Sequence, residues 1–92
     1  MEDLVIWDEK TSQIKVKLSD QHYAMVKVIL VDDTLTITST SVPESLRGKG
    51  SGSQMMETLL VDIEQKGLKV IPACSYVDYY LTKNPQWAHL KA

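Results

Sequence analysis

The amino-acid sequence predicts an α+β domain with one mixed sheet: an antiparallel meander of four strands, a crossover helix, a fifth parallel strand and a C-terminal helix. Three observations support this fold class. Apolar residues recur with a period of two before Pro43, recur at three- and four-residue spacing after Gly50, and form a further short apolar run after that helical pattern. The length of 92 residues and the hydrophobic content of 43% suit a single domain that spans residues 1–92.

The four antiparallel strands are expected in the first half of the chain. Leu4–Trp7 is a short apolar run, and residues 13–19 alternate between apolar and polar side chains, which predicts a strand with one solvated face. Residues 23–31 are apolar on both faces, which predicts a central strand. After a tight turn at Asp32–Asp33, the β-branched run at residues 34–42 predicts a hairpin partner.

The second half of the chain predicts two helices around one strand. Residues 50–66 place their apolar positions on one helical face, and Gly67 suits the left-handed position that follows a helix. Leu68–Ile71 has the length of a strand, and a right-handed crossover through the long helix makes it parallel to the fourth strand. Residues 75–83 again show helical spacing, which Asn84–Pro85 interrupts.

Charge and cysteine content narrow the expected partners, cofactors and cellular compartment. The net charge is −2 and no stretch concentrates lysine or arginine, which disfavours a nucleic-acid partner. The acidic start Met1–Leu4 lacks the basic region of a signal peptide, and apolar runs such as Val28–Val31 end after four residues, so no membrane span is expected. Cys74 is the single cysteine, and no cluster has metal-ligand spacing. We therefore expect a cytoplasmic protein without a metal.

A glycine-rich stretch, Arg47-Gly48-Lys49-Gly50-Ser51-Gly52, lies between the predicted fourth strand and the long helix. Three glycines leave backbone amides uncovered, and a helix N-terminus adds unpaired donors and a partial positive charge, so the stretch suits a phosphate-bearing ligand. It does not fit a Walker A loop, and Ser53 stands where the Rossmann motif needs its third glycine. By itself the stretch is equally compatible with an ordinary tight turn.

The segment Val42–Gly52 resembles the Arg/Gln-x-x-Gly-x-Gly/Ala motif of the GNAT superfamily of acetyl-CoA-dependent N-acetyltransferases. Gly67–Val77 and Asn84–Pro85 resemble its small single-domain branch. The resemblance implies a GNAT-like fold and an N-acetyltransferase that moves an acetyl group from acetyl-CoA to a primary amine of a small molecule or a protein.

The resemblance also implies where the coenzyme lies. Its diphosphate is expected on the amides of Gly48 to Gly52, and its pantetheine arm between the fourth and fifth strands. Pro72, which lacks an N–H group, is consistent with strand pairing that stops there. The coenzyme-binding residues expected from the resemblance are Ser41, Val42, Arg47, Gly48, Lys49, Gly50, Ser51, Gly52, Cys74, Tyr80 and Asn84.

Three residues are candidates for catalysis. Cys74 follows the fifth strand and is either an acyl-accepting nucleophile or a space-filling thiol. Tyr80 matches the GNAT tyrosine that protonates the departing thiolate, or else it is a residue at the core edge. Ser39 and Ser41 occupy the positions at which the small branch has a histidine and an acid, which leaves Glu44 or a water chain as the base.

Two other functions compete with acetyl transfer. A coenzyme A binding module that has lost catalysis would explain the missing histidine and acid, and a structural domain with a glycine turn would need no ligand. The chain is also short beyond the fifth strand. We therefore expect the acceptor side to be open, shallow or completed by another chain, for example in a homodimer.

Overall fold

The computed structural model describes residues 4–8, 10–19, 21–46 and 50–92. They form one five-stranded sheet in the order β1-β2-β3-β4-β5, antiparallel except for the parallel β4–β5 pair, as the sequence predicts. The strands are β1 (Val5–Asp8), β2 (Gln13–Ser19), β3 (His22–Val31), β4 (Thr34–Ser41) and β5 (Lys69–Pro72). The helices are α1 (Ser51–Gln65), α2 (Ser75–Lys83) and the 3₁₀ segments η1 (Glu44–Leu46) and η2 (Pro85–Leu90).

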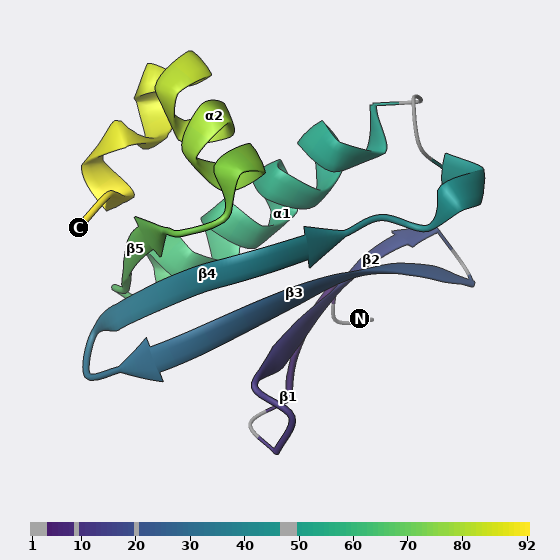
Figure 1. The fold of residues 1–92 in the computed structure, drawn as a ribbon, viewed down its shortest axis with the longest axis horizontal. Coiled ribbons are helices and arrows are strands. Elements are labelled where there is room, and N and C mark those ends of the chain that lie inside the picture. The colour runs from purple at the N-terminus through teal and green to yellow at the C-terminus, as the bar shows by residue number, and fades with distance from the viewer. Residues whose placement is uncertain (1–3, 9, 20, 47–49) are drawn as a thin grey trace.

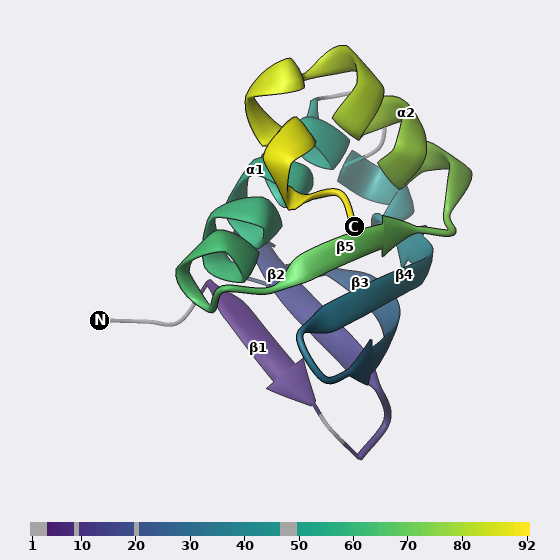
Figure 2. The same cartoon turned by 90° about the vertical axis from the view of Figure 1, so that its left-hand side faces the viewer.

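Both α-helices lie on one side of the sheet, and no α-helix of the described residues covers the other side (Figures 1 and 2). Strand β2 shows how the sequence sets this arrangement. Ile14 and Val16 are fully buried beneath the helices, whereas Lys15 points to the opposite face because side chains alternate along a strand.

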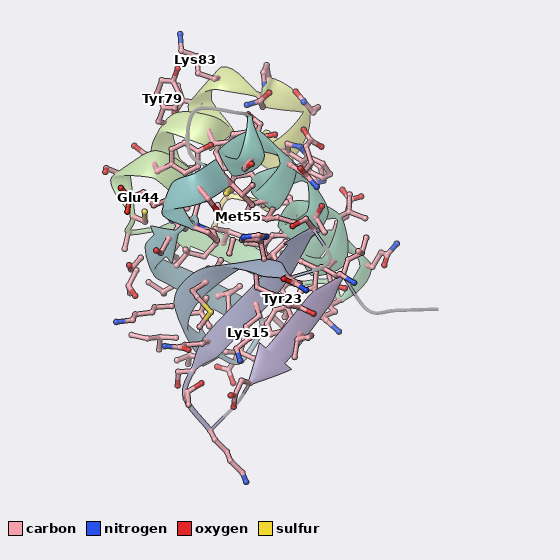
Figure 3. The ribbon with its side chains drawn as sticks, turned by 90° about the vertical axis from the view of Figure 1, so that its right-hand side faces the viewer. Lys15, Tyr23, Glu44, Met55, Tyr79 and Lys83 are labelled. Carbon is pink, nitrogen blue, oxygen red and sulfur yellow. The ribbon has the colours of Figure 1, made fainter. Side chains whose placement is uncertain are left out.

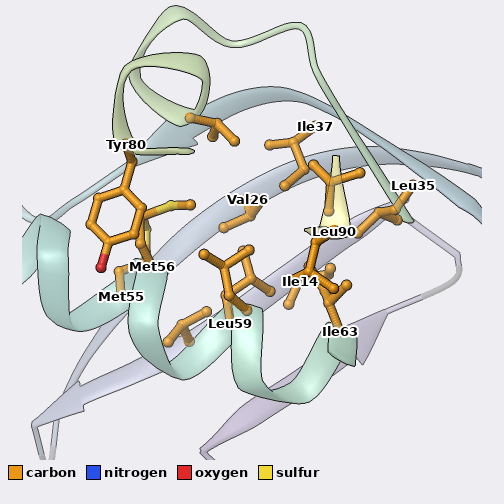
Figure 4. Packing of buried hydrophobic residues seen from close by; sticks show 14 of the residues in the cluster. Ile14, Val26, Leu35, Ile37, Met55, Met56, Leu59, Ile63, Tyr80 and Leu90 are labelled. Carbon is orange, nitrogen blue, oxygen red and sulfur yellow. The ribbon is translucent and has the colours of Figure 1, made fainter. Parts of the chain in front are cut away.

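Helix α1 supplies much of the hydrophobic core. The apolar residues predicted at helical spacing are all fully buried: Met55, Met56, Leu59, Leu60 and Ile63. They pack against β2, β3 and β4 (Figure 4). Each such side chain contributes about 1.5–3 kcal/mol through burial, so this one face fixes the helix to the sheet.

The end of α1 confirms the predicted role of Gly67. This residue has a φ of 72°, in the left-handed region that favours glycine. The Gly67 amide donates to the Glu64 carbonyl and the Leu68 amide donates to the Ile63 carbonyl, which is the Schellman pattern. The chain thereby reverses directly into β5.

Strand β3 is central in the sheet, as its composition predicts, but one of its faces is not covered. Ile29 and Val31 are 55% and 62% exposed because no helix in the described chain crosses that side of the sheet. A sequence that is apolar on both faces therefore indicated the place of β3 among the strands and not the coverage of its faces.

The C-terminal segment closes the edge of the sheet beyond β5. Trp87 and Leu90 of η2 are buried in the core, and the Ala92 amide donates to the Val70 carbonyl at 2.8 Å. No helix within the described ranges is both long and apolar enough to cross a membrane. The histidine, cysteine, aspartate and glutamate side chains of the described chain do not gather into a group suited to a metal ion.

Candidate active site

The turn before α1 presents backbone amides. Gly50 is the N-cap of α1 with φ 77° and ψ 7°, a conformation that favours glycine, and its carbonyl accepts from the Gln54 amide at 3.1 Å. The amides that precede Gln54 in this turn have no partner inside the helix, and no side chain of the described chain caps them. Arg47, Gly48 and Lys49 lie outside the described residues.

Gly52, in the first turn of α1, lies against Tyr76 of α2. A Cβ atom at position 52 would stand 2.6 Å from the Tyr76 Oη atom and 3.2 Å from its Cζ atom. The absence of a side chain at Gly52 therefore allows the N-terminal ends of α1 and α2 to approach each other closely. The sequence predicted Gly52 in the phosphate-binding turn and did not indicate this packing role.

Strands β4 and β5 part beside the N-terminus of α2. Their pairing runs from Thr34 and Lys69 to Ile37 and Pro72, whereas β4 continues to Ser41. The Cys74 amide donates to the Ile37 carbonyl at 2.9 Å. Among the described residues, the last part of β4 thus has a neighbouring strand, β3, on one side alone.

The Cys74 thiol lies at this parting point. Cys74 is the N-cap residue of α2, and its Sγ atom is 3.7 Å from the Oγ1 atom of Thr40 in β4. Burial acts to raise the pKa of the thiol, but hydrogen bonds from the backbone amide of Val77, from the Thr40 side chain and from the Tyr76 amide outweigh it. The pKa of Cys74 therefore lies below its ordinary value, which favours the thiolate.

The Tyr80 hydroxyl contacts Glu57 of α1 and is not hydrogen-bonded to Cys74 or Thr40. It donates to the Glu57 Oε1 atom of α1 at 2.6 Å, and the Trp87 Nε1 atom donates to the same oxygen at 3.4 Å. Figure 4 shows the Tyr80 ring reaching from α2 towards α1. Burial, together with this bond to a carboxylate, raises the pKa of Tyr80, so its hydroxyl keeps its proton and donates it in the hydrogen bond to Glu57.

The remaining predicted site residues are dispersed. The Asn84 Nδ2 atom donates to the Tyr80 carbonyl at 2.8 Å, which caps the C-terminal end of α2, about 15 Å along the helix axis from Cys74. Glu44 is exposed in η1, as Figure 3 shows, and Ser41 is exposed at the end of β4. Val42 packs against the core.

The structure therefore brings together Thr40, Cys74 and, through Tyr76, the glycine turn of α1. Asn84 lies apart from this group. The sequence analysis did not include the contribution of the α2 N-terminus to the Cys74 thiol. The signal was present, since Cys74 directly precedes the helical spacing that begins at residue 75.

The sequence profile of the GCN5-related N-acetyl-transferase family matches residues 13–90. The chain belongs to this family. The GNAT resemblance of the glycine stretch is confirmed, and the chain is an N-acetyltransferase domain. No curated protein matches the sequence.

Two solved structures share the GNAT fold of this chain. One is the solution structure of a GCN5-like putative N-acetyltransferase from Staphylococcus aureus, with 21% identity and a TM-score of 0.68 over 100% of this chain and 91% of that one. The other is the ribosomal-protein-S18-alanine N-acetyltransferase from Escherichia coli, with 14% identity and a TM-score of 0.58 over 92% of this chain. The alignment spans 54% of that enzyme, so this GNAT domain corresponds to about half of it.

Proposed function

We propose that this GNAT domain transfers an acetyl group from acetyl-CoA to a primary amine, with Cys74 at the reacting centre. The observation that carries the proposal is the position of the Cys74 thiol, 3.7 Å from Thr40 and at the point where β4 and β5 part. A thioester that entered between these strands would meet a thiol whose pKa is lowered by the amides of α2.

The residues around this point fit the coenzyme. The first turn of α1, with Gly50 in the left-handed region, offers amides and a helix N-terminus to a diphosphate. From residue 38 to residue 41, β4 pairs with no described strand on the β5 side, so backbone groups other than the Thr40 group bonded to Cys74 are available to an amide-containing arm. The two features are linked through α2, because Tyr76 packs directly on Gly52 and lies two residues after Cys74, which contacts Thr40.

The bound thioester supplies an activated acetyl group. In the proposed first step, the Cys74 thiolate attacks the acetyl carbon, a new carbon–sulfur bond forms and the coenzyme leaves as a thiolate that takes a proton from water. In the second step a neutral amine attacks the acetylated Cys74, the amide bond forms, the Cys74 thiolate leaves and the surplus amine proton passes to solvent. Tyr80, whose hydroxyl donates a hydrogen bond to Glu57, is not needed in either step.

Coenzyme release with a panel of primary amines and peptides tests this function. The wild-type protein is expected to release coenzyme A and to carry one acetyl group on Cys74 in intact-mass analysis when the amine is withheld. Cys74→Ala is expected to lose both signals while still binding acetyl-CoA. Full turnover by Cys74→Ala would replace the covalent route by direct attack of the amine, and absence of turnover with every amine would contradict the transferase proposal.

A coenzyme A binding module without catalysis is the second candidate. It is favoured by one observation: across the part of the chain that the structure describes, no histidine or carboxylate is hydrogen-bonded to Cys74 or Thr40. Thermal unfolding with acetyl-CoA separates a binding domain from one with no ligand, because ligand at 100 times its Kd adds about 2.7 kcal/mol of stability. A shift with no turnover would support the module, and no shift would exclude both candidates.

A further inference from the structure

The sheet face opposite the helices combines exposed apolar side chains with lysines. We call it the open face and define it by Ile6, Lys15, Met25, Lys27, Ile29 and Ile71, which alternate with side chains that pack on the helix side. Ile6, Ile29 and Ile71 are 42%, 55% and 43% exposed. Exposed apolar groups that gather on one face mark an interaction site more often than scattered ones do.

The strand register interleaves the two kinds of side chain. Lys15 lies between Ile6 and Met25 in one row across β1, β2 and β3. In another row Ile29 and Ile71 flank Thr36 across β3, β4 and β5. An occupant of this face would therefore meet both apolar and cationic groups, a combination that a purely apolar partner does not match.

The lysines of the open face share it with one carboxylate of the described strands, Asp8, which lies in the row of Gln13 and Lys27. Lys15 and Lys27 form no ion pair with any residue that the structure describes. The carboxylates of the helices are engaged on their own side of the sheet: Asp62 with Trp7 and Lys66, Glu64 with His89, and Asp78 with Lys91. Lys15 and Lys27 therefore outnumber Asp8 on this face and remain available to a partner's carboxylates.

We infer that the open face binds an acidic, partly apolar polypeptide segment. Carboxylates on such a segment complement Lys15 and Lys27, and its apolar side chains cover Ile29 and Ile71. A second copy of the chain does not fit, because two open faces would bring like charges together. Nucleic acid fits less well, because the described residues of this face are mainly aliphatic, with few cations, no arginine and a single aromatic ring, that of Tyr23.

The open face also reaches the candidate active site. The row of Ile6, Lys15 and Met25 continues to Ser41 at the end of β4, and Ser41 directly follows Thr40, whose side chain lies against Cys74. We therefore assign the bound segment to the acceptor, as a polypeptide whose reactive amine is flanked by acidic residues. This assignment of the substrate class rests on the proposed acetyl transfer, whereas binding at the open face does not.

Peptide binding and turnover test the two parts separately. Three peptides of equal length carry one lysine amine flanked by glutamates, glutamines or arginines, each with one leucine. Binding of the glutamate peptide, with its amine blocked, is followed by ¹H–¹⁵N NMR on the full chain. We expect shifts at the amides of Lys15, Met25 and Lys27, and a Kd about tenfold weaker in the Lys15→Glu/Lys27→Glu protein.

Two control proteins keep this test interpretable. Lys83→Glu/Lys91→Glu makes the same change in net charge on the helix side and is expected to leave the Kd unchanged (Lys83 is labelled in Figure 3). Lys15→Gln/Lys27→Gln removes the two charges without reversing them and is expected to weaken binding to an intermediate degree. This variant tests the same prediction if Lys15→Glu/Lys27→Glu fails to fold. With free amines, the glutamate peptide is expected to have a kcat/KM about tenfold above that of the arginine peptide.

Shifts at the open face without any turnover would retain the docking surface and overturn acetyl transfer. Turnover without peptide preference and without shifts at the open face would overturn the docking surface and retain acetyl transfer. The inference is also overturned by dimerisation through this face or by tighter binding of oligothymidylate than of the glutamate peptide.

Discussion

Replacing Gly52 with alanine is expected to destabilise the domain through its contact with Tyr76. The new Cβ atom would stand 2.6 Å from the Tyr76 hydroxyl oxygen, closer than side-chain carbons approach other atoms. Relieving such an overlap in a packed interface costs about 1–3 kcal/mol. Alanine is the better helix former by at most about 1 kcal/mol, so the net loss is expected to be about 1 kcal/mol, or about 4–8 °C in Tm.

The partner residue decides whether this reasoning is right. In a Tyr76→Phe background the hydroxyl is gone and the closest remaining ring atom is 3.2 Å from the new Cβ, a distance that a small shift accommodates. Gly52→Ala is then expected to be neutral or slightly stabilising. Urea unfolding of the four proteins in this double-mutant cycle measures the coupling. An equal loss in both backgrounds would refute the packing account.

Gly67→Ala is the matched control at the other end of α1. Gly67 has a φ of 72° and no atom within 4 Å of its added Cβ, so alanine there costs about 1 kcal/mol through backbone strain alone. Its effect is expected to be independent of Tyr76. Acetyl-CoA affinity is expected to fall in Gly52→Ala and to persist in Gly67→Ala, because Gly52 alone lies at the candidate site.

Three further predictions concern Tyr80, Cys74 and the core. The pKa of Tyr80 is raised in the folded state, so above about pH 10 the unfolded chain binds fewer protons than the folded chain and the free energy of unfolding falls as pH rises. Urea unfolding from about pH 9 to about pH 11 should show a smaller fall for Tyr80→Phe than for the wild-type protein. Alkylation of Cys74 by iodoacetamide should show a midpoint below that of a free thiol, and Thr40→Val should raise it; an unchanged midpoint would contradict the role of Thr40. Leu59→Ala should cost about 2–5 kcal/mol, whereas Val61→Ala, at a position that is 43% exposed, should cost no more than about 0.5 kcal/mol in the same assay.

The fold could be predicted from the sequence because its main signals are local. The helical spacing of Met55 to Ile63 and the left-handed position of Gly67 are properties of short stretches, and the structure confirms both. The parallel β4–β5 pair follows from chain length and handedness. By contrast, the bare face of β3 depends on where all the helices lie, which no single strand encodes.

Only those features of the candidate site that are formed by short stretches of the chain could be predicted from the sequence. The glycine turn before α1 can be found in the sequence, whereas the direction of the Tyr80 hydroxyl depends on how α2 is rotated against α1. The low pKa of Cys74 arises from amides two and three residues further along, which become donors only once α2 has formed. Likewise, Lys15 and Lys27 share one face because of the β2–β3 register.

A ¹H–¹⁵N NMR titration with acetyl-CoA tests the central claim most directly, since it reports where the coenzyme binds whether or not turnover occurs. The account predicts shifts at the amides of Gly50 to Ser53, at Ser39 to Ser41 of β4 and at Cys74 to Val77 of α2, with amides of β1 unchanged. Shifts confined to other surfaces, or none at millimolar ligand, would contradict the proposed coenzyme site.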